Sequence, residues 1–162
     1  MVNIDQIKKQ TRLALPKDDS YLYRLGVALY AFASINSFMT EIICHIDKTK
    51  NRTSLLDETS GIVLKQFNNT LAKIKIEGKH IEIHDVMQQT ADLFKKLNDQ
   101  RTDFVHSYPI TNKDNKQILH RRKDAAGKYF EIDNSFLDKF ISELHNVSDG
   151  LYKIREVVAP NV

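Results

Sequence analysis

Apolar residues recur at intervals of three and four along most of this 162-residue chain, and this spacing limits the fold more than any other feature. In the segment from about 20 to 46 this spacing continues without a break, with Asn36 as its polar member: Leu22, Leu25, Leu29, Phe32, Asn36, Met39, Ile43 and Ile46. Such spacing places side chains on one face of an α-helix. We therefore predict a long helix that buries this face, with alanine and serine on one flank where another helix can approach.

Three more segments carry the same pattern, at about 54–76, 82–107 and 134–158, and a short amphipathic helix is predicted at about 3–15. Five Gly and three Pro in the whole chain favour helices over sandwiches and barrels. The length fits one domain, residues 1–162. We predict an all-α fold, an up-and-down four-helix bundle with a short N-terminal lead helix.

Residues 108–133 interrupt the helical pattern before the last helix. Pro109 disfavours helical geometry at Tyr108, so the preceding helix is expected to end there. The stretches 117–120 and 128–132 flank Asp124-Ala-Ala-Gly127. This arrangement predicts a small β-hairpin inserted before the last helix.

The net charge, the cysteine content and the first residues of the chain limit which kinds of protein this can be. A net charge of +3 is compatible with an anionic partner without requiring one. The single cysteine, Cys44, excludes an internal disulfide and is expected to be a small core residue. The first residues lack the apolar core of a signal peptide, and we find no apolar run long enough to span a bilayer. We expect a cytoplasmic protein without a membrane segment.

Arg101 and His106 are the residues most suggestive of chemistry. Arg101 takes the next place in the apolar stripe of the helix predicted at 82–107, where a guanidinium is costly to bury without an acceptor. On an undistorted helix the two side chains lie about 140° apart, so they converge only if the helix loosens or a second subunit closes the site. Together they could move a proton on a phosphodiester and hold its negative charge without a metal.

The stretch Arg101-Thr-Asp-Phe-Val-His106 resembles the motif of the HEPN superfamily, small helical-bundle domains marked by Arg, four to six residues, then His. Many members are metal-independent endoribonucleases of toxin–antitoxin, phage-defence and CRISPR-associated systems, and they often dimerise so that two motifs form one cleft. The resemblance implies that His106 handles the proton of the ribose 2′-hydroxyl or of the leaving group, and that Arg101 holds the scissile phosphate. The resemblance further implies that cleavage leaves 2′,3′-cyclic phosphate ends and needs no metal or cofactor. The partners it implies are RNA or a nucleotide, a second copy of the chain, and an antitoxin protein.

The resemblance also implies supporting roles for Thr102, Asp103 and Tyr108. Family members commonly have Asn or Asp straight after the Arg, and here Thr102 stands there with Asp103 next. Tyr108 completes an Arg-x4-His-x-Tyr pattern similar to that of HEPN toxins silenced by adenylylation of the tyrosine. Pro109 and the hairpin after it do not look like those toxins.

A basic run, His120-Arg121-Arg122-Lys123, lies on the predicted hairpin. This run is either a solvated turn or, in a nuclease, a site where Arg121, Arg122 and Lys123 bind the phosphates of the RNA backbone. Tyr129 or Phe130 could stack on a base, and one of the two is expected to pack in the hairpin instead. His80 and His84 have the spacing of helical metal ligands but no third ligand, so we expect no metal site.

Two other interpretations remain open. The chain could be a helical bundle that binds a nucleotide or RNA phosphate without cleaving it. It could also be a structural or immunity-type protein, with Arg101 salt-bridged in the core and His106 a helix-end histidine. A solvent-open cleft around both residues would favour nuclease or binding module, whereas Arg101 sealed against Asp103 or Glu41 would favour the structural role.

Overall fold

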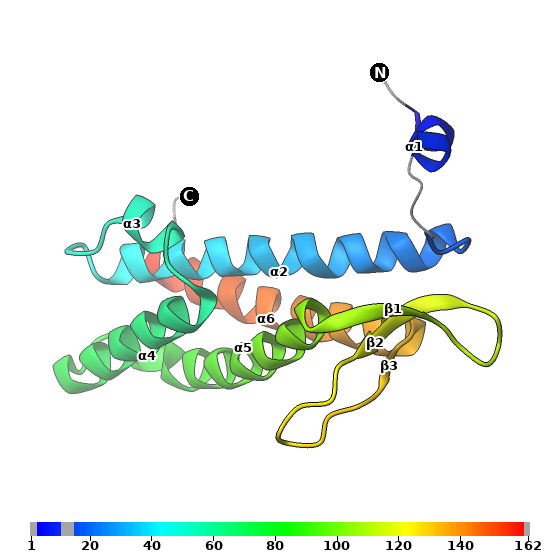
Figure 1. The fold of residues 1–162 in the computed structure, drawn as a ribbon. Coiled ribbons are helices and arrows are strands. Elements are labelled where there is room, and N and C mark those ends of the chain that lie inside the picture. The colour runs from blue at the N-terminus through cyan, green and yellow to red at the C-terminus, as the bar shows by residue number, and fades with distance from the viewer. Residues whose placement is uncertain (1–2, 11–14, 161–162) are drawn as a thin grey trace.

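The computed structural model describes residues 3–10 and 15–160 (Figure 1). Within them the long helices are α2 (Asp19–Ile46), α4 (Ser60–Glu77), α5 (His84–Val105) and α6 (Asn134–Val158). Helix α2 contacts α4 and α6, and α5 contacts the same two helices. The short elements are α1 (Ile4–Gln10), α3 (Arg52–Leu56) and the 3-10 turn η1 (Ile81–Ile83). The prediction of a mainly helical chain is confirmed.

Short polar side chains set where the helices begin. The Asp18 carboxylate accepts a hydrogen bond from the Ser20 amide at the start of α2, and the Asp133 carboxylate accepts one from the Phe136 amide in α6. Each bond satisfies an amide that has no partner within its helix. Gly78 ends α4 in the left-handed region at φ 63°, which glycine adopts without strain.

Two predicted helices differ in extent from the observed ones. The helix predicted at 54–76 is interrupted, because Thr59 caps a new helix, α4, by accepting a hydrogen bond from the Ile62 amide. The apolar spacing of this segment places Leu56 on the inward face, but Leu56 is 46% exposed, while Leu55 beside it is buried. The lead helix, predicted at about 3–15, is observed as α1, and residues 11–14 lie outside the described part of the chain.

The core follows the predicted faces of α5 and α6 closely. Phe94 of α5 stacks on Phe32 of α2 at 5.3 Å between ring centres, and Phe104 meets Phe140 of α6 edge to face at 4.9 Å. In α2 the predicted face is partly wrong, because Leu29 is 44% exposed. The first half of α2 is apolar on several sides, so spacing alone did not identify the buried side.

A three-stranded antiparallel sheet follows α5, with β1 (Ser107–Thr111), β2 (Gln117–Arg121) and β3 (Glu131–Ile132) in the order β1-β2-β3. Pairing of β2 with β3 confirms the predicted hairpin. Strand β1 contains Pro109 and was not predicted from the sequence. Because β1 lies at the edge of the sheet, its proline is tolerated. Ile118 and Ile132 are buried and join the sheet to the helical core.

The expectation that no segment is long and apolar enough to cross a membrane is wrong for α2. An 18-residue window of this helix has a mean hydropathy of 1.5, and 39% of the window is buried. A core helix of a water-soluble protein passes the same test, so the finding is weak evidence for a membrane span. In this structure α2 contributes Phe32, Met39 and Ile43 to the core.

Candidate site at the end of helix α5

Arg101 is half-buried and lies over an aromatic ring. Its guanidinium carbon is 5.7 Å from the centre of the Phe32 ring in α2. No hydrogen bond or ion pair joins it to a described residue. Glu41 instead lies within salt-bridge distance of Arg52 and Arg155, and Asp103 is engaged elsewhere. The sealed core salt bridge considered for Arg101 is therefore absent from the described part of the chain.

His106 ends α5 and is exposed to solvent. Its amide donates to the Thr102 carbonyl at 3.1 Å, and its carbonyl accepts from the Arg122 amide at 3.1 Å. No contact joins its imidazole to Arg101 within one chain, in agreement with the angle that separates them on a helix. The Thr102 hydroxyl donates to the Asn98 carbonyl, so it is bound to its own helix.

Asp103 and Arg121 differ from their expected roles. Asp103 is 3% exposed and Arg121 is 6% exposed, and they form an ion pair with 2.7 Å between Oδ1 and Nε. Lys128 adds a second cation at 3.1 Å from Asp103 Oδ1. Asp103 therefore anchors the sheet, and its buried carboxylate faces Arg121 and Lys128. The expectation that Arg121 presents its charge to RNA is wrong, whereas Arg122 and Lys123 are exposed.

Rings from β1, β2 and the segment before β3 form a cluster that we call the ring cluster: Tyr108, His120 and Tyr129. Tyr108 lies directly opposite His120 in the β1–β2 register, with 5.8 Å between ring centres. The His120 and Tyr129 rings are 4.2 Å apart. Tyr129 is 60% exposed, whereas Phe130 packs on Phe136. Of the two aromatic residues expected either to stack or to pack, Phe130 packs.

Hydrogen bonds orient the members of the ring cluster. His120 Nδ1 lies 2.9 Å from the Arg121 carbonyl, which can only accept, so Nδ1 carries the hydrogen and Nε2 is left without it in the neutral ring. A hydrogen bond with Tyr129 raises the pKa of the Tyr108 hydroxyl above its ordinary value, with burial as the second cause. The Arg122 charge acts on the same hydroxyl in the opposite direction. The cation of Arg122 therefore lies within electrostatic reach of the cluster.

His106, Tyr108 and Arg122 were predicted as site residues from the sequence, but their relation to His120 was not. In the sequence His120 stands out only as part of a basic run. The missing signal was strand β1, because the pairing of Tyr108 with His120 exists only when residues 107–111 form a strand. Strand pairing across a turn leaves no fixed spacing in the sequence.

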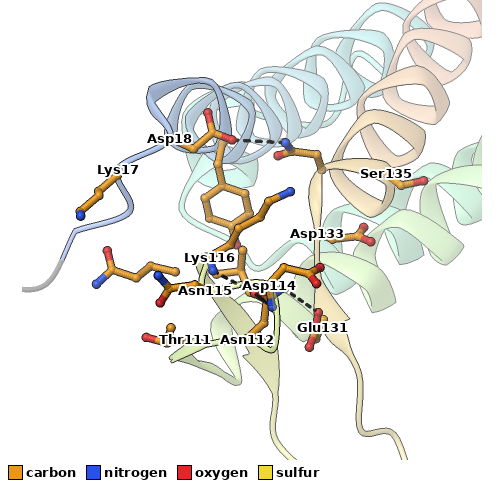
Figure 2. A pocket seen from close by; sticks show the side chains of 14 residues that line it. Lys17, Asp18, Thr111, Asn112, Asp114, Asn115, Lys116, Glu131, Asp133 and Ser135 are labelled. Carbon is orange, nitrogen blue, oxygen red and sulfur yellow. Dashed lines mark hydrogen bonds between the residues drawn. The ribbon is translucent and has the colours of Figure 1, made fainter.

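A cavity of about 420 Å³ opens at the other end of the sheet, beside the starts of α2 and α6 (Figure 2). Its charged lining consists of Asp18, Asp114, Glu131, Asp133, Lys17 and Lys116. Carboxylates outnumber ammonium groups there, so this cavity repels the phosphates of RNA. It is not the candidate site.

Neither a metal-binding cluster nor a similar known protein helps to assign a function to the site. Among the described residues no group of three or more His, Cys, Asp or Glu side chains could hold a metal ion. Models of protein families, curated proteins and solved structures gave no match to this chain. The residues of this chain and their geometry are therefore the basis on which its function is inferred.

Proposed function

We propose that the protein is a metal-independent endoribonuclease of the HEPN type, acting in the cytoplasm in a toxin–antitoxin or phage-defence system. The observation that carries the proposal is the exposed imidazole of His106 at the end of α5, next to the cationic and aromatic face of the sheet. Contacts of α2 and α5 with α4 and α6 support the associated proposal of an up-and-down four-helix bundle.

The proposed reaction needs a proton carrier and a cation. One imidazole removes the proton of the ribose 2′-hydroxyl, the 2′-oxygen bonds to phosphorus, and the bond from phosphorus to the 5′-oxygen breaks. The leaving 5′-oxygen takes up a proton, giving a 2′,3′-cyclic phosphate and a 5′-hydroxyl. His106 is our candidate for proton transfer, and Arg101 is our candidate for stabilising the negative charge.

A second copy of the chain is part of the proposal, because Arg101 and His106 make no contact within one chain. Residues 25–40 of α2 include no charged side chain, and Tyr30 is 80% exposed there. Burying such a face against a partner is favourable. We propose that a second copy covers it and brings Arg101 of one subunit near His106 of the other.

The test is cleavage of labelled total RNA and tRNA by purified protein in excess EDTA. We expect cyclic-phosphate ends, and loss of cleavage in both His106→Ala and Arg101→Ala. His145→Ala is the matched control, because His145 is an exposed histidine on α6, where its imidazole pairs with Asp149. Cleavage that persists in the His106 and Arg101 variants would contradict the proposal.

The alternative is a bundle that binds RNA, a nucleotide or a protein partner, such as an antitoxin, without cleaving RNA. One observation favours it: the Arg101 guanidinium lies over the Phe32 ring instead of near His106. Absence of cleavage combined with salt-sensitive RNA binding would support this alternative.

A further inference from the structure

We propose that the ring cluster and Arg122 form the RNA-binding part of the nuclease site, with His120 as a second proton-transfer group, Arg122 as a phosphate-binding side chain and Tyr129 as a base-stacking ring. This inference rests on the proposed function. It adds three residues to His106, namely His120, Arg122 and Tyr129, and all of them come from the same chain as His106.

Strand register places these groups together. The Arg122 amide donates to the His106 carbonyl, so the β1–β2 pairing extends by one step beyond Ser107 and Arg121. Two residues further along β1, Tyr108 lies directly opposite His120. His106 and His120 are thus diagonal neighbours, which brings their backbones within roughly 8 Å.

The hydrogen bond to the Arg121 carbonyl prepares His120 for proton transfer. Because this bond fixes the hydrogen on Nδ1, the neutral ring keeps a lone pair on Nε2. The centres of the Tyr108 and Tyr129 rings lie 5.8 Å and 4.2 Å from the centre of the His120 ring and limit its movement. His120 is thus half-buried and oriented before any substrate arrives.

Arg122 has a charge that no described carboxylate neutralises. The nearby Asp124 carboxylate pairs with Arg121 instead and accepts the Lys128 amide. An exposed guanidinium without a partner can bind a phosphate through two parallel hydrogen bonds. Its neighbour Lys123 is exposed as well and adds charge without that geometry.

Tyr129 has a ring that is 60% exposed, and the centre of the His120 ring lies 4.2 Å from its own centre. A nucleotide base can stack on an exposed aromatic side chain, and stacking requires a base that is not in a duplex. The substrate class is therefore single-stranded RNA, or the loops of folded RNA. During cleavage one imidazole would accept the 2′-hydroxyl proton while the other, already protonated, gives its proton to the leaving 5′-oxygen.

The experiment compares His120→Ala, Arg122→Ala, Tyr129→Ala and Tyr129→Phe with the wild type on a labelled single-stranded RNA and on its 2′-O-methyl analogue, which cannot be cleaved. We expect His120→Ala to lower cleavage by about 100-fold or more, to leave analogue binding unchanged, and to remove one limb of a bell-shaped pH profile. Arg122→Ala should weaken analogue binding and reduce its salt slope by about one phosphate contact. Tyr129→Phe should bind like the wild type, and Tyr129→Ala should bind more weakly.

The two proposals fail in different ways. If the wild type cleaves RNA and His120→Ala cleaves equally well, the inference is wrong and the nuclease function stands. If the wild type does not cleave RNA, the nuclease function and the proton-transfer role of His120 are both wrong. If Arg122→Ala and Tyr129→Ala bind the analogue like the wild type, the ring cluster and Arg122 do not bind RNA. A purely structural role of His120 would change the melting temperature and leave the shape of the pH profile unaltered.

Discussion

Nε of Arg121 lies 2.7 Å from Oδ1 of Asp103, and this buried ion pair joins the end of β2 to the last turn of α5. The same guanidinium donates to the Arg122 carbonyl at 2.8 Å and to Asp124 at 2.9 Å. Because Asp103 is three residues before His106 and Arg121 is next to Arg122, the pair holds the two candidate site residues beside each other.

Removing Asp103 should strongly destabilise the protein. Asp103→Ala leaves the Arg121 guanidinium buried without its main acceptor, and breaking such a pair from one side costs about 3–5 kcal/mol. Urea unfolding of Asp103→Ala and of Asp99→Ala gives the comparison. Asp99 lies exposed on the same helix, and its replacement should change the free energy of unfolding by about 0.5 kcal/mol at most. Equal stabilities of the two variants would contradict the anchoring role.

Gly150 and Gly26 are helical glycines with opposite expected responses to alanine. A Cβ atom at Gly150 in α6 would collide with Oγ1 of the buried Thr90 in α5, whereas a Cβ at Gly26 in α2 meets nothing within 4 Å. We expect Gly150→Ala to destabilise by about 1–3 kcal/mol through overpacking, and Gly26→Ala to stabilise by up to about 1 kcal/mol through helix propensity.

Thermal or urea unfolding measures both effects, and Thr90→Ala combined with Gly150→Ala should recover part of the loss, because it removes the colliding hydroxyl. If Gly150→Ala alone is as stable as the wild type, α5 and α6 are not packed this closely. The pair of glycines therefore tests the packing of the helix that ends at the candidate site.

The sequence was sufficient to predict the helices and insufficient to predict the site. Faces of α5 and α6 were predictable because each helix has one apolar side, as Met87 and Leu144 illustrate. The roles of Asp103 and Arg121 were not, since an ion pair between residues 18 apart depends on how the sheet folds back on the helix. His120 was missed for the same reason, because its neighbours lie across the strands and not along the chain.

Asp47 should make stability depend on pH at the acid end. Its carboxylate accepts hydrogen bonds from the amide and hydroxyl of Thr49 and from Lys73, and the Thr49 hydroxyl bond is the largest cause that lowers the pKa of Asp47 below its ordinary value. A lowered pKa in the folded state contributes stability above the pKa of the unfolded chain, and this contribution is lost as the pH falls through the folded value.

Asp47→Asn should therefore be about 1–2 kcal/mol less stable than the wild type near neutral pH, and the difference should shrink once the carboxyl is protonated. Urea unfolding at a series of pH values checks this. Asp57→Asn is the control, because Asp57 is exposed and only its backbone caps α3. A gap between Asp47→Asn and wild type that stays constant down to the lowest pH would exclude the carboxylate as its source.

Arg101 offers the sharpest separation of function from structure. Among the described residues its side chain has no hydrogen-bond or ion-pair partner and lies over the Phe32 ring, and a half-buried cation over an aromatic ring contributes about 0.5–2 kcal/mol. We therefore expect Arg101→Ala to lose at most about 2 kcal/mol in urea unfolding, while losing RNA cleavage or binding entirely. Arg101→Lys should keep the charge and part of the RNA binding, because an ammonium lacks the paired donors of a guanidinium. A loss of several kcal/mol in Arg101→Ala, with RNA binding intact, would instead make Arg101 a structural core residue, because only a residue that anchors the fold produces that combination.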